Sequence, residues 1–370
     1  MKEWEAFRDK ATVKGLAKAI GDRMTTSHVI MEMCGGQTNS IARYQLEKIL
    51  PPDLELVHGP GCPVCVTPQT VIDQAVALAS RPEVIFTSFG DMMRVPGKKD
   101  SLMSMKSRGA DVRIVYSPLD ALGIARQNPD REVVFFAIGF ETTAPVHALA
   151  LREAQRLGVS NFSLLTSLVT VPAAVSALME DPDNRVEGLL AAGHVCAVTG
   201  YEEYHALARK YSLPVCITGF EPVDLLWGIY NCIDQLESGE HTVRNNYSRM
   251  VQACGNAAAI SVINDVFEPF DQEWRGLGII PQSGLRIREK YEPYDASVRF
   301  KIIKESESYE SECRAADIMK GKIHPCKCPA FGIRCTPENP LGASMVSSEG
   351  ACAAYFKYNK YERDTMSAAI

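Results

Sequence analysis

The stretch VVFFAIGFETTAP, residues 133–145, decides the fold class. Six apolar residues of strand-forming type are followed by Gly139 and a polar turn, and then by a segment of helix length. The same order recurs along the chain, with apolar runs at residues 28–33, 54–58, 83–89, 112–116, 133–138, 162–169, 187–193 and 214–219. Strands that alternate with helices predict an α/β protein with parallel sheets.

The number of strands leaves two architectures open. Eight strands fit either one closed barrel or two four-stranded Rossmann-like lobes, and we favour two lobes that face a central cleft. A chain of 370 residues exceeds the size of most single cores, so two or three domains are expected. We place the first lobe at residues 1–135 and the second at residues 136–275.

The remainder, residues 276–370, is expected to form a third unit. Residues 242–266, before it, have a helical pattern, and residues 276–300 read as an irregular connector. Five cysteines then follow within 40 residues, among many glycines and prolines. This composition predicts a small C-terminal module held together by a metal.

The overall composition excludes several classes of protein. A net charge of −6 and a pI of about 5.7 argue against nucleic-acid binding, which needs clustered basic residues. The longest apolar run is far shorter than the ~18 residues that span a bilayer, so we expect no membrane segment. The charged N-terminus lacks a signal-peptide core, which predicts a cytoplasmic protein. Twelve cysteines in a reducing compartment favour metal or redox roles over static disulfides.

Unusual residues follow the predicted strands. In open parallel sheets, ligand sites lie beyond the carboxyl ends of the strands, so the loops there gather along one edge. Glycine and proline are also ordinary turn formers, but cysteine, histidine and acidic residues recur in these loops. The loops are CGGQTN (34–39), GPGCPVC (59–65), GDMMRVPG (90–97), GFETTAP (139–145), GHVC (193–196) and GFEP (219–222).

Cys34 is the first candidate site residue. Gly35 and Gly36 permit a sharp turn, and the helix after them would aim free N–H groups at the thiol. A helix N-terminus lowers the pKa of a thiol, which would suit a soft-metal ligand or a nucleophile. The alternative is a small buried cysteine at the end of a strand.

Four further residues in these loops are candidates. Cys62 and Cys65 form a CxxC pair, which suggests a redox couple; half of a zinc site or a pair of inert thiols remains open. His194 could bind iron or move a proton, although a lone histidine is as often structural. Asp91 could orient a thiol or accept a proton, and the alternative is a plain turn or cap role.

The C-terminal cysteines point to a metal centre. Four thiolates suit either structural zinc or a [4Fe–4S] cluster. Zinc modules usually offer two close pairs, whereas these cysteines are scattered, which favours the cluster. Cys326 and Cys328 are separated by one residue only, so both are not expected to bind the same cluster. The cysteines concerned are Cys313, Cys326, Cys328, Cys335 and Cys352.

Taken together, these motifs closely resemble the hydrogenase maturation factor HypD family, from about residue 28 to residue 360. The resemblance rests on CGGQTNSIARY, HGPGCPVCVTP, FGDMMRVPG, FAIGFETTAP, AAGHVCAVTG, GFEP and CTPENPLGASMVSSEGACAAYFKY. It implies two α/β domains, a C-terminal [4Fe–4S] module and a role in assembling the iron–dicyano–carbonyl unit, Fe(CN)2CO, of [NiFe]-hydrogenases. The implied partners are a HypC-type small chaperone and a HypE-type cyanide donor.

The resemblance also implies roles for single residues. Cys34 would hold the nascent iron together with a cysteine of the HypC-type partner, and Cys62 and Cys65 would be a redox-active dithiol. Cys326 would be the extra cysteine of the module. The implied cluster ligands are Cys313, Cys328, Cys335 and Cys352.

One position departs from the family pattern. The family usually reads CGGHT, whereas this chain has Gln37, which can form hydrogen bonds but cannot exchange a proton near neutral pH. If the usual histidine has an acid–base or ligand role, the chain must do without it or use His194. Two other functions remain open: an assembly scaffold with a purely structural cluster, and an iron–sulfur disulfide reductase.

Overall fold

The computed structural model describes residues 3–302 and 312–358. All eight predicted strands are present, which confirms the α/β class. Their bounds are β1 His28–Glu32, β2 Leu54–His58, β3 Val84–Ser88, β4 Val112–Ile114, β5 Glu132–Gly139, β6 Phe162–Val169, β7 Gly188–Ala192 and β8 Val215–Thr218.

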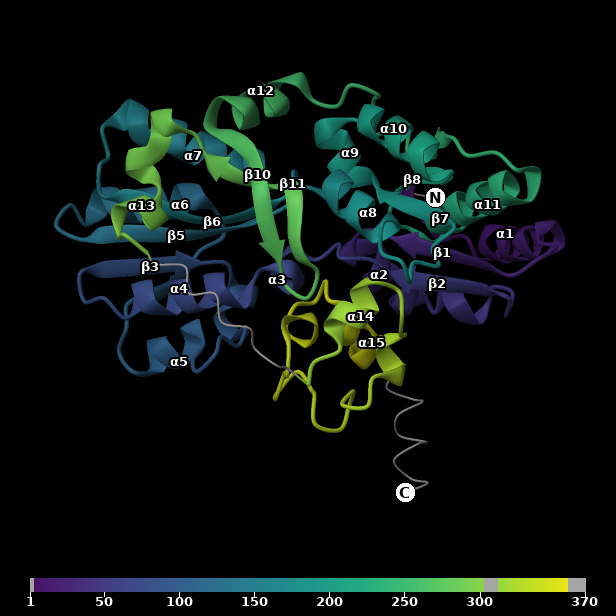
Figure 1. The fold of residues 1–370 in the computed structure, drawn as a ribbon, viewed down its shortest axis with the longest axis horizontal. Helices are drawn as coiled ribbons and strands as arrows, with labels where there is room; N and C mark the ends of the chain where they lie inside the picture. The colour runs from purple at the N-terminus through teal and green to yellow at the C-terminus, as the bar shows by residue number, and fades with distance from the viewer. Residues whose placement is uncertain (1–2, 303–311, 359–370) are drawn as a thin grey trace.

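The strands form two separate sheets, as the two-lobe prediction requires, and no barrel (Figure 1). The first sheet has the order β2-β1-β7-β8-β9 and is parallel throughout, with the short β9, Val243–Asn245, at its edge. The second sheet has the order β10-β11-β6-β5-β3-β4. Its strands β3 to β6 are parallel, and β10 and β11 add an antiparallel edge.

The sheets do not follow the predicted division of the chain at residue 135. That residue lies inside β5, and residues 1–135 contribute β1 and β2 to one sheet but β3 and β4 to the other. The chain enters the first sheet, crosses to the second after β2, and returns with β7. The division is corrected because β1 pairs with β7, a strand about 160 residues further along the chain.

Helices cover both sheets, and most lie where the sequence predicts them. Several begin at a residue that caps them, for example Ser117, whose side chain accepts the N–H of Leu119 at the start of α6. The helices before residue 240 are α1 Lys10–Arg23, α2 Gly35–Tyr44, α3 Pro63–Val66, α4 Gln69–Ala79, α5 Leu102–Ser107, α6 Pro118–Gln127, α7 Ala144–Leu157, α8 Val171–Met179, α9 Gly193–Thr199, α10 Glu202–Tyr211 and α11 Pro222–Ser238.

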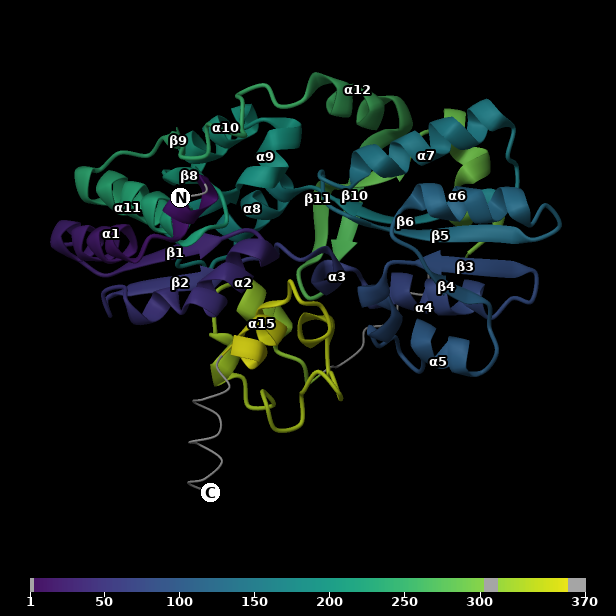
Figure 2. The same cartoon turned by 180° about the vertical axis from the view of Figure 1, so that it is seen from behind.

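The segment after residue 240 differs from the prediction. Only α12, Ala257–Val266, is helical in the stretch 242–266. The supposed connector contains β11, Gly278–Ile287, which forms an antiparallel hairpin with β10, Phe267–Trp274, and pairs with β6. In Figures 1 and 2 this hairpin stands between the two sheets.

The C-terminal module packs beneath the junction of the two sheets (Figure 1). Its described part, residues 312–358, contains the short helices α14, Ala315–Met319, and α15, Ala351–Tyr358, joined by turns. Helix α15 packs on α2, the helix that follows Cys34. Residues 303–311 and 359–370 of the predicted third unit lie outside the described residues. No helix in the described ranges is long and apolar enough to cross a membrane.

Candidate thiol and metal site

Three predicted site residues meet at one edge of the first sheet. Cys62 follows β2, Cys34 follows β1 and His194 follows β7, and these strands are neighbours in the order β2-β1-β7. Because parallel strands end at the same edge, the loops after them lie side by side, as predicted.

Cys34 is the N-cap of α2. Its sulfur accepts the N–H of Gly36 at 3.3 Å, and its own N–H donates to Glu32 at 2.8 Å. The predicted thiolate is nevertheless not the resting form. Burial, reinforced by the nearby Glu32 carboxylate, raises the pKa of Cys34 to about 12 and outweighs the N–H groups of Gly36 and Gln37. A bound cation would reverse this balance, because metal ions displace the protons of their thiol ligands.

His194 lies beside the Cys34 thiol. Both of its ring nitrogens are 3.8 Å from the Cys34 sulfur, and its ring packs edge-on against Phe220. Burial lowers the pKa of His194 to about 4, so the imidazole is neutral at pH 7. A neutral ring at this place can accept a proton or offer a nitrogen to a metal.

Gln37 has a structural environment. Its side chain is fully buried and donates to the hydroxyl of Thr218 at 2.7 Å and to the carbonyl of Ala191 at 3.4 Å. These partners belong to β7 and β8, so the amide bridges two strands of the first sheet. His194 is therefore the imidazole that the structure places beside Cys34 in this chain.

Cys62 and Cys65 form a disulfide across the short helix α3. The backbone of the preceding Gly61 lies against Cys34: an added Cβ would be 2.4 Å from the Cys34 Cα atom. The carbonyl of Gly61 also accepts the N–H of Gly35 at 3.2 Å. The disulfide loop and the Cys34 loop are thus in direct contact, and Gly35, Cys62 and Cys65 line one small cavity.

Asp91 contacts the C-terminal module. It lies in a 3-10 turn, Gly90–Arg94, and accepts the hydroxyl of Ser347 at 2.8 Å. Arg94 of the same turn donates to the carbonyl of Pro337 at 3.1 Å. These contacts link the loop after β3 to the C-terminal module, and the catalytic role expected for Asp91 stays a prediction.

A buried polar network behind Cys34 was not predicted. Glu32, which binds the Cys34 N–H, also accepts a hydrogen bond from Nδ1 of His58 at 2.7 Å. Nε2 of His58 lies 2.9 Å from the hydroxyl of Tyr355, which lies 2.7 Å from Glu47. Glu47 forms an ion pair with His324 at 3.6 Å. The residues of this network come from distant segments of the chain, so the sequence does not reveal it. Only His58, next to the CxxC motif, could have been recognised as a candidate.

The four implied cluster ligands gather in the C-terminal module. Cys328, Cys335 and Cys352 share one small apolar core, and Cys313 interacts electrostatically with Cys335 and Cys328. Burial raises the pKa of Cys352 to about 12, and burial also raises the pKa of Cys313. Cys313 and Cys65 line the same cavity of about 1020 Å³, between α4 and the module.

Among the described residues, the cysteines of the module do not form a tight group of metal ligands. Tetrahedral zinc with bonds of about 2.3 Å brings its ligand sulfurs to about 3.8 Å of one another. In the described part of the chain, the one group of three or more metal-binding side chains within 4.8 Å is Glu47, His58 and His324. The module thiols are close enough to interact electrostatically, and the choice of a cluster over zinc stays a prediction.

The fold and the site define a class: a two-sheet α/β thiol protein with a cysteine-rich C-terminal module. A family model described as "HypD: Hydrogenase formation hypA family" matches residues 11–359. The chain is 48% identical to the hydrogenase maturation factor HypD of Rhodobacter capsulatus, over 97% of this chain and 98% of that protein. It is 46% identical to that of Escherichia coli K12, over 90% of each chain. The chain belongs to the HypD family of hydrogenase maturation factors.

Proposed function

We propose that this maturation factor works in the cytoplasm and holds iron at Cys34 while the Fe(CN)2CO unit is built, together with a HypC-type chaperone and a HypE-type cyanide donor. The observation that carries the proposal is the meeting of Cys34, His194 and the Cys62–Cys65 disulfide at one sheet edge. Thiolate is a suitable soft donor for iron that carries cyanide and carbonyl.

Iron binding at Cys34 must displace the proton of the thiol. The neutral ring of His194 is 3.8 Å from that sulfur and can take up the proton. The resting thiol is buried and protonated, so it stays unreactive until a cation arrives.

The Cys62–Cys65 pair is the proposed electron source for cyanide transfer. Release of cyanide from a thiocyanate consumes two electrons and one proton and leaves a thiolate and hydrogen cyanide. Oxidation of the Cys62–Cys65 dithiol to the disulfide supplies two electrons and two protons, one of which is left for solvent. The contact of Gly61 with Cys34 puts this electron source next to the proposed iron ligand.

Cys313, Cys328, Cys335 and Cys352 are the residues that would hold a [4Fe–4S] cluster. When bound, the cluster supplies one-electron transfers, the chemistry needed to return a disulfide to the dithiol. Cys352 lies on α15, which packs on α2, and Cys313 lines the cavity that Cys65 also lines.

The test is to replace Cys62 and Cys65 by alanine and to record infrared spectra of the complex with the HypC-type partner. We expect the cyanide and carbonyl bands to be lost. Cys254→Ala, at an exposed cysteine, serves as the control and should keep the bands. Undiminished bands in the double variant would remove the dithiol from the mechanism and leave the scaffold function. In a scaffold, the cluster would also keep its oxidation state when the dithiol is reduced.

A further inference from the structure

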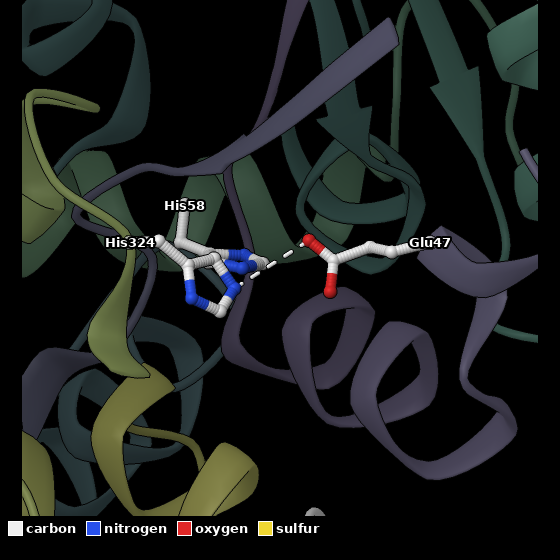
Figure 3. Close-up of side chains that lie close together, drawn as sticks. All are labelled: Glu47, His58 and His324. Atoms are coloured by element: carbon white, nitrogen blue, oxygen red, sulfur yellow. Dashed lines mark ion pairs between the residues drawn. The ribbon is translucent and has the colours of Figure 1, made fainter. Parts of the chain in front are cut away.

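We propose that Glu47, His58 and His324 form a second metal site, for a divalent first-row transition ion, between the first sheet and the C-terminal module. Each residue offers one ligand atom, and these atoms all lie within 4.8 Å of one another. Figure 3 shows the two imidazole rings side by side, with the Glu47 carboxylate directed at them. The site is separate from the Cys34 edge and from the cysteines of the module.

The surroundings of His58 are those of a metal ligand. Its Nδ1 donates to the buried Glu32 carboxylate at 2.7 Å, which fixes the ring, and its Nε2 faces the Tyr355 hydroxyl at 2.9 Å. A carboxylate behind a histidine ligand is the usual outer partner at metal sites, since it sets the tautomer and raises the basicity of the ligand.

The hydroxyl of Tyr355 occupies the space between two of the proposed ligands. It lies 2.9 Å from Nε2 of His58 and 2.7 Å from Glu47. It donates its proton to the Glu47 carboxylate and so cannot also donate to Nε2 of His58. A cation bound by Nε2 and the carboxylate satisfies both acceptors and releases the tyrosine hydroxyl from this position.

The donor set selects the kind of ion. Two imidazoles and one carboxylate suit Fe²⁺, Co²⁺ and Zn²⁺, whereas Mg²⁺ and Ca²⁺ prefer oxygen ligands alone. The side chain of Cys326 hydrogen-bonds His324. Cys326, which the four-ligand cluster leaves over, therefore lies beside the site but is not one of its three ligands.

The test uses the full-length protein and Co²⁺ as a visible-spectrum probe, with Zn²⁺ and Fe²⁺ as competitors and Mg²⁺ as a non-competing ion. We expect wild type to bind one Co²⁺ more per chain than His324→Ala, and Glu47→Gln to bind this ion at least ~10-fold more weakly. His205→Ala, on α10, is the matched control and should bind as wild type does.

Tyr355→Phe separates a metal site from a hydrogen-bonded network. Loss of the competing hydroxyl should tighten Co²⁺ binding several-fold if a metal occupies the site. Circular dichroism would establish that each variant is folded. Glu47→Gln, which keeps the side-chain shape, replaces His324→Ala if His324→Ala is not folded.

Equal Co²⁺ stoichiometry and affinity in wild type, His324→Ala and Glu47→Gln would overturn the proposal, as would displacement of Co²⁺ by Mg²⁺. Either result would mean that the three side chains form a hydrogen-bonded network and not a metal site.

Discussion

At the scale of single residues, burial decides which groups are charged. Cys34 and His194 are both kept neutral by burial, and for Cys34 burial outweighs the effect of a helix N-terminus. Glu141 shows the same effect. Its side chain accepts the N–H of Val171 at 2.8 Å, at the start of α8. Its other oxygen has no partner among the described residues.

Glu141→Gln is predicted to stabilise the protein at high pH. Burial raises the pKa of Glu141 from 4.5 to about 7. Between these values the folded state keeps a proton that the unfolded state has lost, so stability falls as pH rises from about 4.5 to 7 and stays low above it. Glutamine does not titrate, so the variant does not lose this stability. We expect the variant to be more stable than wild type by on the order of 3 kcal/mol at pH 8 and by close to zero at pH 4.5. Thermal unfolding of variant and wild type across this pH range measures the difference.

The control for this prediction is Glu202→Gln, at an exposed position at the start of α10. It should leave the melting temperature within the range of ordinary surface substitutions, about 0.5 kcal/mol, at every pH. A pH-independent effect of Glu141→Gln would show that the carboxyl does not titrate in this range.

At the scale of elements, the hairpin of β10 and β11 depends on one buried hydrogen bond. The indole N–H of Trp274 donates to the hydroxyl of Ser283 at 2.8 Å, and that hydroxyl donates to the carbonyl of Ile280 at 2.7 Å. The Trp274 ring packs on Phe140, which precedes Glu141. The hairpin thereby contacts the loop after β5.

Ser283→Ala is predicted to destabilise the protein by about 1–3 kcal/mol, because it leaves the buried indole N–H without an acceptor. Urea unfolding followed by tryptophan fluorescence provides the measurement. Ser107→Ala is the matched serine control: its hydroxyl is exposed and binds only a carbonyl of its own helix. An effect of Ser283→Ala no larger than that of the control would contradict the assigned bond.

The elements also show what sequence patterns can predict. The eight strands were predicted because they are apolar and buried, a local property that composition reveals. The hairpin was missed because β10, FEPFDQEW, alternates buried and exposed residues and contains proline. Strand β11 contains two glycines and a proline, which also suggested a connector.

The assignment of strands to sheets and the protonation of the site residues depend on the whole molecule. The pairing of β1 with β7 joins residues far apart in the chain, and no local pattern encodes it. The loops of Cys34, Cys62 and His194 were placed together correctly because parallel strands end at one edge. The sequence did not predict the raised pKa of Cys34, because the C-terminal module contributes to the burial of this thiol. In that module, Glu349 packs directly on Gly35.

At the scale of the whole molecule, we expect the C-terminal module to depend on a bound metal. Its internal core comprises few buried residues, and its described part has only two short α-helices and two 3-10 turns. A unit of this size rarely folds on apolar burial alone and usually depends on metal–ligand bonds. Its remaining supports are contacts with the rest of the chain, such as Ser347 with Asp91, Arg94 with the Pro337 carbonyl and Tyr355 with Glu47.

Cys335→Ser is therefore predicted to unfold the module while the two sheets persist. Loss of one ligand should remove about four irons per chain if a [4Fe–4S] cluster is bound. Limited proteolysis with mass spectrometry should then show new cleavage within residues 312–358 and a resistant fragment that carries both sheets. Cys326→Ser, at the exposed extra cysteine, should retain the iron and the protease resistance of wild type. If Cys335→Ser kept its iron and resisted protease equally well, the module would be held by contacts with the sheets, and these four cysteines would not be its cluster ligands.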